Sequence, residues 1–204
     1  MEGVQDLSLA IKYNFFSKDF GDNTFKTFVV GTFSTPLTDY TPDFLPLSIG
    51  LASTTVAGRL NANYRFLKRW FVNGSAGYTW RSNVTLDRPS YYTEGQLFLT
   101  DEVDMPNVFD YFISAGYLYK GLQVELNLIQ QNTLGGDDIR RQDMPFVSNK
   151  MNYVKGGVLV MYYLPKPKGM AVRGSAMYTL AGRNVGQSTT FMGGLLYTLK
   201  FIKN

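Results

Sequence analysis

Apolar and polar residues alternate with a period of two in nine segments along the chain. In the segment 55–66, for example, Val56 and Leu60 fall on one face, while Arg59 and Asn63 fall on the other. This period predicts β-strands with one apolar and one polar face, and no segment keeps the period of a helix. The predicted strands cover about residues 6–15, 25–33, 55–66, 70–81, 109–119, 122–129, 154–162, 170–180 and 191–201.

The length of these segments favours a membrane protein over a soluble one. Strands of about ten residues cross a bilayer when tilted, whereas strands of soluble domains are about half as long. The apolar faces also end in aromatic residues, as at membrane interfaces. We therefore expect one domain over residues 1–204, an all-β, antiparallel, up-and-down transmembrane β-barrel in a Gram-negative outer membrane. A soluble sandwich and a lipocalin-like barrel are the alternatives, because they alternate too and would fold without detergent.

The connections alternate between short and long. Residues 17–23, 68–69, 120–121 and 165–168 are predicted as short turns, and residues 35–54, 83–106 and 132–151 as long loops. Outer-membrane barrels keep short turns in the periplasm, and bacterial ones have an even number of strands with both ends there. Nine strands would leave the first residues outside. We therefore expect an N-terminally incomplete barrel that lacks an odd number of strands and the signal peptide; completion by another chain is the alternative.

Composition excludes several classes of chemistry. The chain has no Cys and no His, which excludes disulfides, thiolate or imidazole metal sites and histidine-dependent catalysis. The net charge of +4 comes from scattered residues, unlike a nucleic-acid footprint. We expect no enzyme activity, no metal and no cofactor, and no nucleic acid as a partner.

The polar faces of the strands predict the lining of the barrel. Charged residues on these faces can pair and fill a narrow interior, or they can line a hydrated passage whose positive surplus favours anions. Phe71, Phe112 and Tyr153 also point inward, which would suit aromatic solutes. The candidate lining residues are Lys12, Arg59, Arg65, Arg81, Asp110, Glu125, Lys155 and Arg173.

The last predicted strand carries a candidate assembly signal. A glycine followed by alternating aromatic and aliphatic residues is typical of the C-terminal signal read by the barrel assembly machinery. Here the pattern consists of Gly194, Tyr197, Leu199 and Phe201. An ordinary amphipathic last strand is the alternative.

Two long loops carry clustered charges. Loop 83–106 holds five carboxylates and one arginine, which indicates a solvated acidic loop, with binding of Ca²⁺ or bridging to lipopolysaccharide as the alternative. In the second loop, Asp137, Asp138 and Asp143 lie among Arg140 and Arg141, which predicts ion pairs within that segment.

Several segments resemble one family of outer-membrane barrels. The stretch Gly3–Tyr13 resembles a "G-x-x-D-hydrophobic-x-hydrophobic-x-x-K-Y" strand of the meta-pathway phenol-degradation (MetA-like) family, often labelled "transporter". Residues 46–51, which run into the strand with Asn63 and Tyr64, and residues 70–78 fit the same layout, and residues 91–93 and 137–145 resemble a Bacteroidota-type branch. The resemblance implies about twelve strands and a porin-like role in passing small, often hydrophobic or aromatic molecules. It implies no catalytic residues.

The sequence thus gives two functional hypotheses. The first is a barrel that passes small molecules across the outer membrane. The second is a structural or assembly barrel that anchors partners in an envelope complex. In both, the expected partners are outer-membrane lipid, lipopolysaccharide and, during biogenesis, the barrel assembly machinery.

Overall fold

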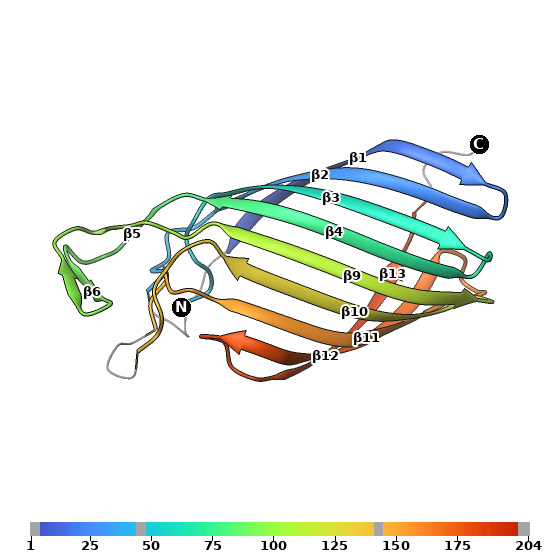
Figure 1. Cartoon of the computed structure of the whole chain (residues 1–204). Coiled ribbons are helices and arrows are strands. Elements are labelled where there is room, and N and C mark those ends of the chain that lie inside the picture. The colour runs from blue at the N-terminus through green and yellow to red at the C-terminus, as the bar shows by residue number, and fades with distance from the viewer. Residues whose placement is uncertain (1–4, 44–47, 141–144, 200–204) are drawn as a thin grey trace.

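A computed structural model describes residues 5–43, 48–140 and 145–199. Neighbouring strands in the sequence are antiparallel neighbours in one nine-stranded sheet, so the predicted all-β, up-and-down fold is confirmed (Figure 1). The described part of the chain contains no helix that is long and apolar enough to span a membrane. The strands of the sheet are β1 (Asp6–Phe20), β2 (Asn23–Pro36), β3 (Thr55–Phe66), β4 (Trp70–Arg81), β9 (Val108–Tyr119), β10 (Leu122–Thr133), β11 (Asn152–Tyr163), β12 (Met170–Arg183) and β13 (Thr189–Tyr197).

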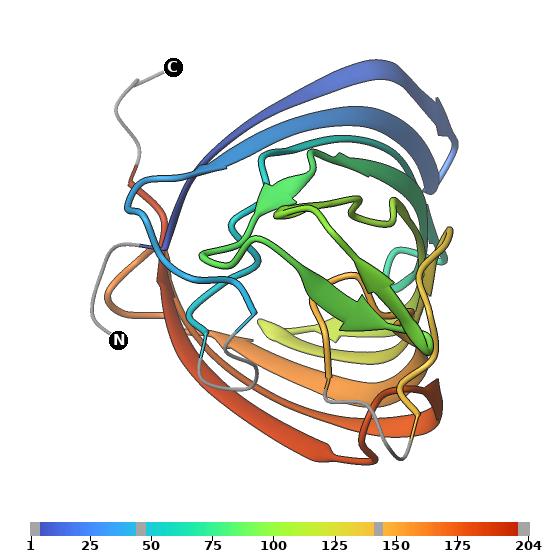
Figure 2. The same cartoon turned by 90° about the vertical axis from the view of Figure 1, so that its left-hand side faces the viewer.

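The sheet curves around a central space (Figure 2). Its two ends are β1 and β13, which are not hydrogen-bonded to each other within the described residues. Because nine strands alternate in direction, β1 and β13 run the same way. The completion of the barrel by an odd number of further strands stays a prediction.

The first turn is shorter than the sequence predicts. Strand β1 continues to Phe20, and the turn is only Gly21-Asp22, so the expected turn over residues 17–23 is wrong. The cause is a β-bulge between Asn14 and Phe16. Asn14 pairs with Phe28 and Phe16 with the next residue of β2, Thr27, so Phe15 is an extra residue without a partner in the register. The bulge breaks the period of two at Phe15. The alternation of apolar and polar residues therefore does not reveal that the strand continues to Phe20.

The outer face of the sheet is apolar along its whole height. Ile11 is 77% exposed, and Leu60, Leu126 and Val172 are also exposed on this face. The aromatic residues gather near both ends of the strands, where the rings of Trp70 and Tyr117 lie 4.8 Å apart. The outer face thus carries the apolar surface that a soluble sheet would bury.

The long connections form a structured cap at one end of the sheet. Residues 82–107 contain two small hairpins, β5 (Val84–Thr85) with β8 (Glu102–Val103) and β6 (Tyr91–Thr93) with β7 (Gln96–Phe98). In Figure 2 these hairpins lie across the view into the sheet. They share a loop core of buried side chains: Val84, Leu86, Tyr91, Val103, Met105, Phe146 and Val147.

Ion pairs in the cap join different loops. Arg88 pairs with Asp43 at 2.9 Å, and Arg140 pairs with Glu94 at 3.2 Å. Arg183 donates to Asp138, with Nε 2.7 Å from Oδ1. The expected pairing of Asp138 and Arg140 within their own segment is therefore wrong, because β12 and the loop at 82–107 present closer partners; Arg141 and Asp143 lie outside the described residues.

Candidate functional site

One row of inner-face residues crosses seven strands of the sheet. Register partners follow one another from β1 to β11, because neighbouring strands are paired without interruption along this row. We call this set the transverse row. It consists of Lys12, Val30, Arg59, Gly77, Asp110, Gln131 and Tyr153.

An ion pair in the transverse row reaches across a whole strand. Nη2 of Arg59 on β3 lies 2.8 Å from Oδ2 of Asp110 on β9, and Gly77 of β4 lies between them. A Cβ at Gly77 would stand 2.9 Å from Oδ1 of Asp110 and 3.0 Å from Nε of Arg59. The absent side chain at Gly77 therefore provides the space in which the guanidinium meets the carboxylate.

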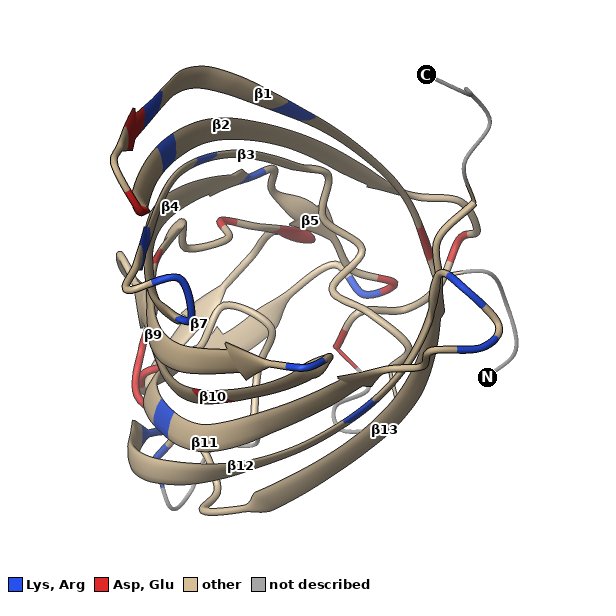
Figure 3. Ribbon diagram, turned by 90° about the vertical axis from the view of Figure 1, so that its right-hand side faces the viewer, with Lys and Arg blue, Asp and Glu red and all other residues tan. Residues whose placement is uncertain are grey.

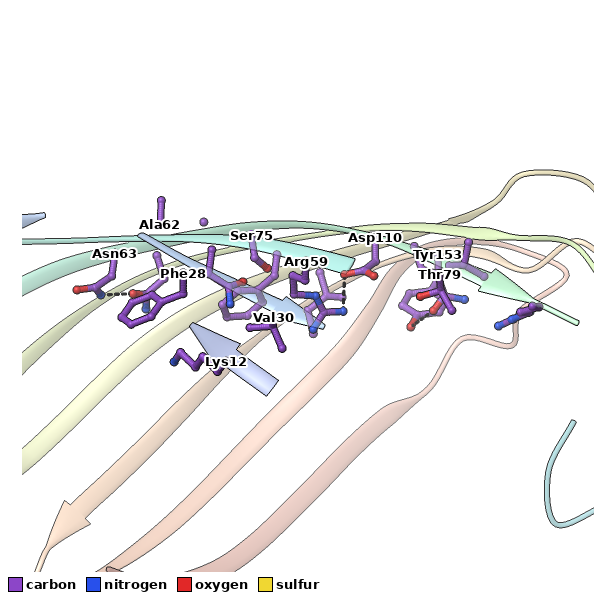
Figure 4. Close-up of a pocket in the computed structure, with 18 residues that line it drawn as sticks. Lys12, Phe28, Val30, Arg59, Ala62, Asn63, Ser75, Thr79, Asp110 and Tyr153 are labelled. Carbon is purple, nitrogen blue, oxygen red and sulfur yellow. Dashed lines mark hydrogen bonds and ion pairs between the residues drawn. The ribbon is translucent and has the colours of Figure 1, made fainter. Parts of the chain in front are cut away.

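The transverse row borders a cavity of about 830 Å³ on the inner face (Figure 4). Polar and apolar groups both line this cavity. Tyr153 donates its hydroxyl hydrogen to Oε1 of Gln131 at 3.0 Å, while the rings of Phe28 and Phe112 supply apolar surface. A cavity of this size and mixed lining is typical of small-molecule sites.

Positive charge exceeds negative charge at the cavity. Nζ of Lys12 lies 4.2 Å from the centre of the Phe28 ring. Arg81 reaches the carbonyl oxygen of Pro106 at 3.5 Å. Among the described residues, neither cation pairs with a carboxylate, and Asp110 is shared with Arg59. Two cations at the cavity are therefore available to a bound anion.

The inner face towards the short turns is filled instead. Asn63 donates to Asn73, which in turn donates to Oγ of the buried Ser114 at 3.0 Å. The ring of Phe71 lies over Gly116, where a Cβ would overlap it. The polar chain thus leads from two residues of the cavity lining, Asn63 and Asn73, to the buried Ser114, and beyond it the Phe71 ring fills the interior.

The structure divides the eight predicted lining residues into two groups. Their register places all of them on the inner face. The first group lines the cavity and consists of Lys12, Arg59, Arg81 and Asp110. The second group lies outside its lining and consists of Arg65, Glu125, Lys155 and Arg173.

Three residues of the second group are held by neighbours in the wall. Glu125 is buried and accepts a hydrogen bond from Gln123 at 3.1 Å. Nζ of Lys155 lies 4.8 Å from the centre of the Tyr153 ring. Arg173 is the register partner of Gly194, over which its side chain extends. These residues help to build the wall rather than the cavity surface.

Sequence reasoning missed Gly77, Gln131 and Phe28 as parts of the site. Each lies on the polar parity of its strand, so alternation alone could have assigned its face. The pairing of strands was needed to bring them beside Arg59 and Asp110, and one sequence without register information does not supply it.

Two residues of the candidate assembly signal, Gly194 and Tyr197, lie on β13, the last strand of the sheet. Tyr197 and Leu199 are both 59% exposed, and Gly194 is on the inner parity beside Arg173. Strand β13 ends at Tyr197, so Leu199 follows the strand, in contrast to the predicted strand end at residue 201. Phe201 lies outside the described residues.

The acidic side chains of the cap are distributed among separate partners. Asp87 accepts a hydrogen bond from Thr41, and Glu102 accepts one from Asn83 at 2.8 Å. No group of three or more acidic side chains that could hold a metal ion occurs in residues 5–43, 48–140 or 145–199. The Arg183 guanidinium and the Asn184 amide donate to Asp138 and hold its pKa below the ordinary value of an aspartate.

Comparison with models of protein families identifies the family of this chain. A search of the curated proteins finds no significant relative. The model of the family described as "Putative MetA-pathway of phenol degradation" matches residues 2–193, which is nearly the whole chain. The match agrees with the all-β fold and with the strand motifs of the sequence. This chain is a member of the MetA-pathway phenol-degradation family.

Proposed function

We propose that the protein is an outer-membrane β-barrel that passes small molecules through its interior. The cavity beside the transverse row is the observation that carries this proposal, because it offers space and polar partners inside the wall. The apolar outer face provides the surface that hydrocarbon requires on the other side.

The two tryptophans support a membrane-spanning orientation. Trp70 and Trp80 lie at opposite ends of β4, and both are exposed on the outer face. Ten residues of strand extend about 33 Å, and a strand tilt of about 40° reduces this to about 25 Å along the barrel axis. That distance equals the height of the apolar band in outer-membrane barrels, with a tryptophan at each interface.

The chemistry of the cavity favours solutes that combine an apolar ring with an anionic or polar group. The rings of Phe28 and Phe112 can contact an apolar body. Lys12 and Arg81 can bind a carboxylate or phenolate oxygen, because the described residues provide them with no acidic partner. We propose small aromatic acids as the preferred class.

A closed barrel needs partners for the edges of β1 and β13. Unpaired backbone groups at these edges cannot face lipid. Since β1 and β13 run in the same direction, an odd number of additional antiparallel strands would close the wall. We propose that such strands complete the barrel in the membrane.

Spin labels on two adjacent residues test the orientation of the wall. The chain has no cysteine, so Ala76→Cys and Ser75→Cys each give one labelled site at nearly the same depth. We expect the label at position 76 to be accessible to oxygen dissolved in lipid and the label at position 75 to a water-soluble relaxation agent. The opposite result would refute the proposed orientation.

Planar-bilayer recording of the full-length protein, purified from outer membranes, tests the passage itself. We expect discrete channels that prefer anions, because cations exceed carboxylates at the cavity. Arg81→Glu should lower the anion-to-cation permeability ratio by about tenfold, whereas Arg183→Glu, in the cap, should change it little. A protein that inserts but never conducts would exclude the channel.

A structural barrel that anchors partners is the second candidate. It is favoured by the cap, where the β6–β7 hairpin exposes Tyr92, Leu97 and the adjoining Leu99 above a rigid loop core. Exposed apolar groups on a structured loop are typical of interaction surfaces. Stoichiometric copurification of an envelope protein that is lost in Leu97→Asp and Leu99→Asp, together with a silent bilayer, would favour this function.

A further inference from the structure

The rim formed by the short turns carries a surplus of positive charge. Its residues are blue and red at the ends of the strands in Figure 3. The residues of these turns include five cations and one carboxylate, a net charge of +4. These residues are Lys68, Arg69, Lys120, Lys166 and Lys168 against Asp22.

Two of these cations share one aromatic ring on the outer face. The guanidinium carbon of Arg69 lies 4.3 Å from the centre of the Tyr119 ring, and Nζ of Lys120 lies 5.2 Å from the same centre. Nη1 of Arg69 also donates to the hydroxyl oxygen of Tyr117 at 3.1 Å. Tyr117 packs on Trp70, so the rings lie on the outer face of the wall.

Contacts with the same ring keep both cations at the edge of the apolar surface. Arg69 and Lys120 come from different turns, the one between β3 and β4 and the one between β9 and β10. The order of the strands brings these turns together, because β4 pairs with β9. The aliphatic stems can cover the aromatic belt while the charged groups stay in the headgroup layer.

The pair lacks an acidic partner among the described residues. The rim carboxylate Asp22 pairs with Lys68 at 3.3 Å, and neither Arg69 nor Lys120 forms an ion pair with a described carboxylate. Only Nη1 of the Arg69 guanidinium has a described acceptor, Tyr117, so the remaining N–H groups can donate to a further one. A guanidinium and an ammonium group near one ring are complementary to phosphate.

We infer that Arg69, Lys120 and Tyr119 bind the phosphate of an anionic phospholipid in the leaflet at the short-turn end. This inference rests on the proposed membrane location and goes beyond it by naming a lipid-binding site. Phosphatidylglycerol fits, because it offers a phosphate without a compensating cation. In the topology of outer-membrane barrels, the short turns face the phospholipid leaflet on the periplasmic side.

Fluorescence quenching of Trp70 by brominated lipids tests the site. Trp80→Phe leaves Trp70, beside Tyr117, as the single tryptophan of these 204 residues, and any tryptophan in the additional strands is also replaced by phenylalanine. The full-length protein is reconstituted in phosphatidylcholine vesicles that contain a small, equal fraction of brominated phosphatidylglycerol or brominated phosphatidylcholine. We expect brominated phosphatidylglycerol to occupy the site about fivefold more often than its fraction in the bilayer predicts.

Two double variants separate a specific site from diffuse attraction. Arg69→Gln with Lys120→Gln should reduce quenching by phosphatidylglycerol to the level of phosphatidylcholine. Lys166→Gln with Lys168→Gln removes the same charge from the same rim and should leave the preference intact. Arg69→Lys keeps the charge but loses the planar donor geometry, and it should give an intermediate value.

The results distinguish failure of the site from failure of the membrane proposal. Equal quenching by the two brominated lipids in the parent protein, or equal loss in both double variants, would overturn the lipid site. Absence of quenching by either lipid would overturn the membrane location instead. Near-native circular dichroism of each variant in vesicles is required for the comparison.

Discussion

The two halves of the inner face obey the same alternation but differ in packing. Towards the cap, the transverse row borders an open cavity, with Arg59 and Asp110 joined across Gly77. Towards the short turns, Phe71 lies over Gly116, and the polar chain ends at the buried Ser114. Parity along a strand therefore decides which residues point inward, whereas the sizes of register partners decide whether space remains.

This difference lets one wall contain both a packed region, which stabilises the sheet, and an open cavity. Glycine has opposite effects in the two halves. At Gly116 the absent side chain leaves room for the Phe71 ring, which fills the interior. At Gly77 the absent side chain leaves room for the ion pair between Arg59 and Asp110 at the border of the cavity. The four predictions below test this contrast, from the largest expected effect to the smallest.

The largest effect is expected from Phe71→Ala in the filled half. Removing this buried ring leaves a void above Gly116 and should lower the free energy of unfolding by about 3 kcal/mol. Phe112→Ala is the matched control in the open half; because its ring already borders the cavity, it should cost about 1 kcal/mol. Denaturant titration in vesicles measures both values. Equal losses would remove the distinction between the halves.

The next effect concerns Ser114, the end of the polar chain that lies in the filled half. Ser114→Ala removes the acceptor of the Asn73 amide and should cost about 1 kcal/mol in the same titration, because the site is buried. Ser75→Ala, on the same face beside the cavity, should cost less than about 0.5 kcal/mol, since water can replace the hydroxyl. A larger loss at Ser75 would show that the open half is not hydrated.

A double-mutant cycle tests the bridge across Gly77. Arg59→Gln and Asp110→Asn should show a coupling of about 0.5 kcal/mol, because the Arg59 side chain is half exposed and solvent screens the pair. In a Gly77→Val background the coupling should vanish. Gly58→Val is the control on β3, where a Cβ meets nothing within 4 Å. Coupling that survives Gly77→Val would mean that the pair does not need the glycine.

The smallest effect concerns the cap above the open half. Arg183 lowers the pKa of Asp138, so the interaction is fully present above the ordinary aspartate pKa of about 4 and is lost as the pH falls through the lowered value. Hydrogen exchange at Ile139, whose amide donates to Asn184, should therefore accelerate at low pH beyond the intrinsic rate. Asp138→Asn should remove this dependence, and Asp101→Asn should retain it. A pH-independent parent protein would contradict the assignment.

The wall of the protein could be predicted from the sequence, and the cap could not. Alternation identified all nine strands, because each strand has one apolar outer face and one largely polar inner face, and successive residues point to opposite faces. The hairpins at Tyr91 and Val103 have two or three residues per strand, too few for any period to be recognised. The loop core depends on Phe146, which is distant in the sequence from the hairpins that it covers.

The site was predicted in part, for a related reason. Lys12, Arg59, Arg81 and Asp110 were recognisable as charges on the polar parity. Gly77 carries no such signal, because its role is to leave space between residues of two other strands. The division into an open and a filled half depends on the combined side-chain volumes of register partners on neighbouring strands. Which residues are register partners is known only from the pairing of the strands.

The bulge in β1 has a consequence for how this wall tolerates change in length. Asn14 faces inward and Phe16 outward, as they would if Phe15 were absent, so Phe15 amounts to one inserted residue confined to the outer surface. Deleting it would restore unbroken alternation and leave Lys12 on the inner face and Phe20 on the outer face. A strand with such a bulge can gain or lose one residue without exchanging its inner and outer faces.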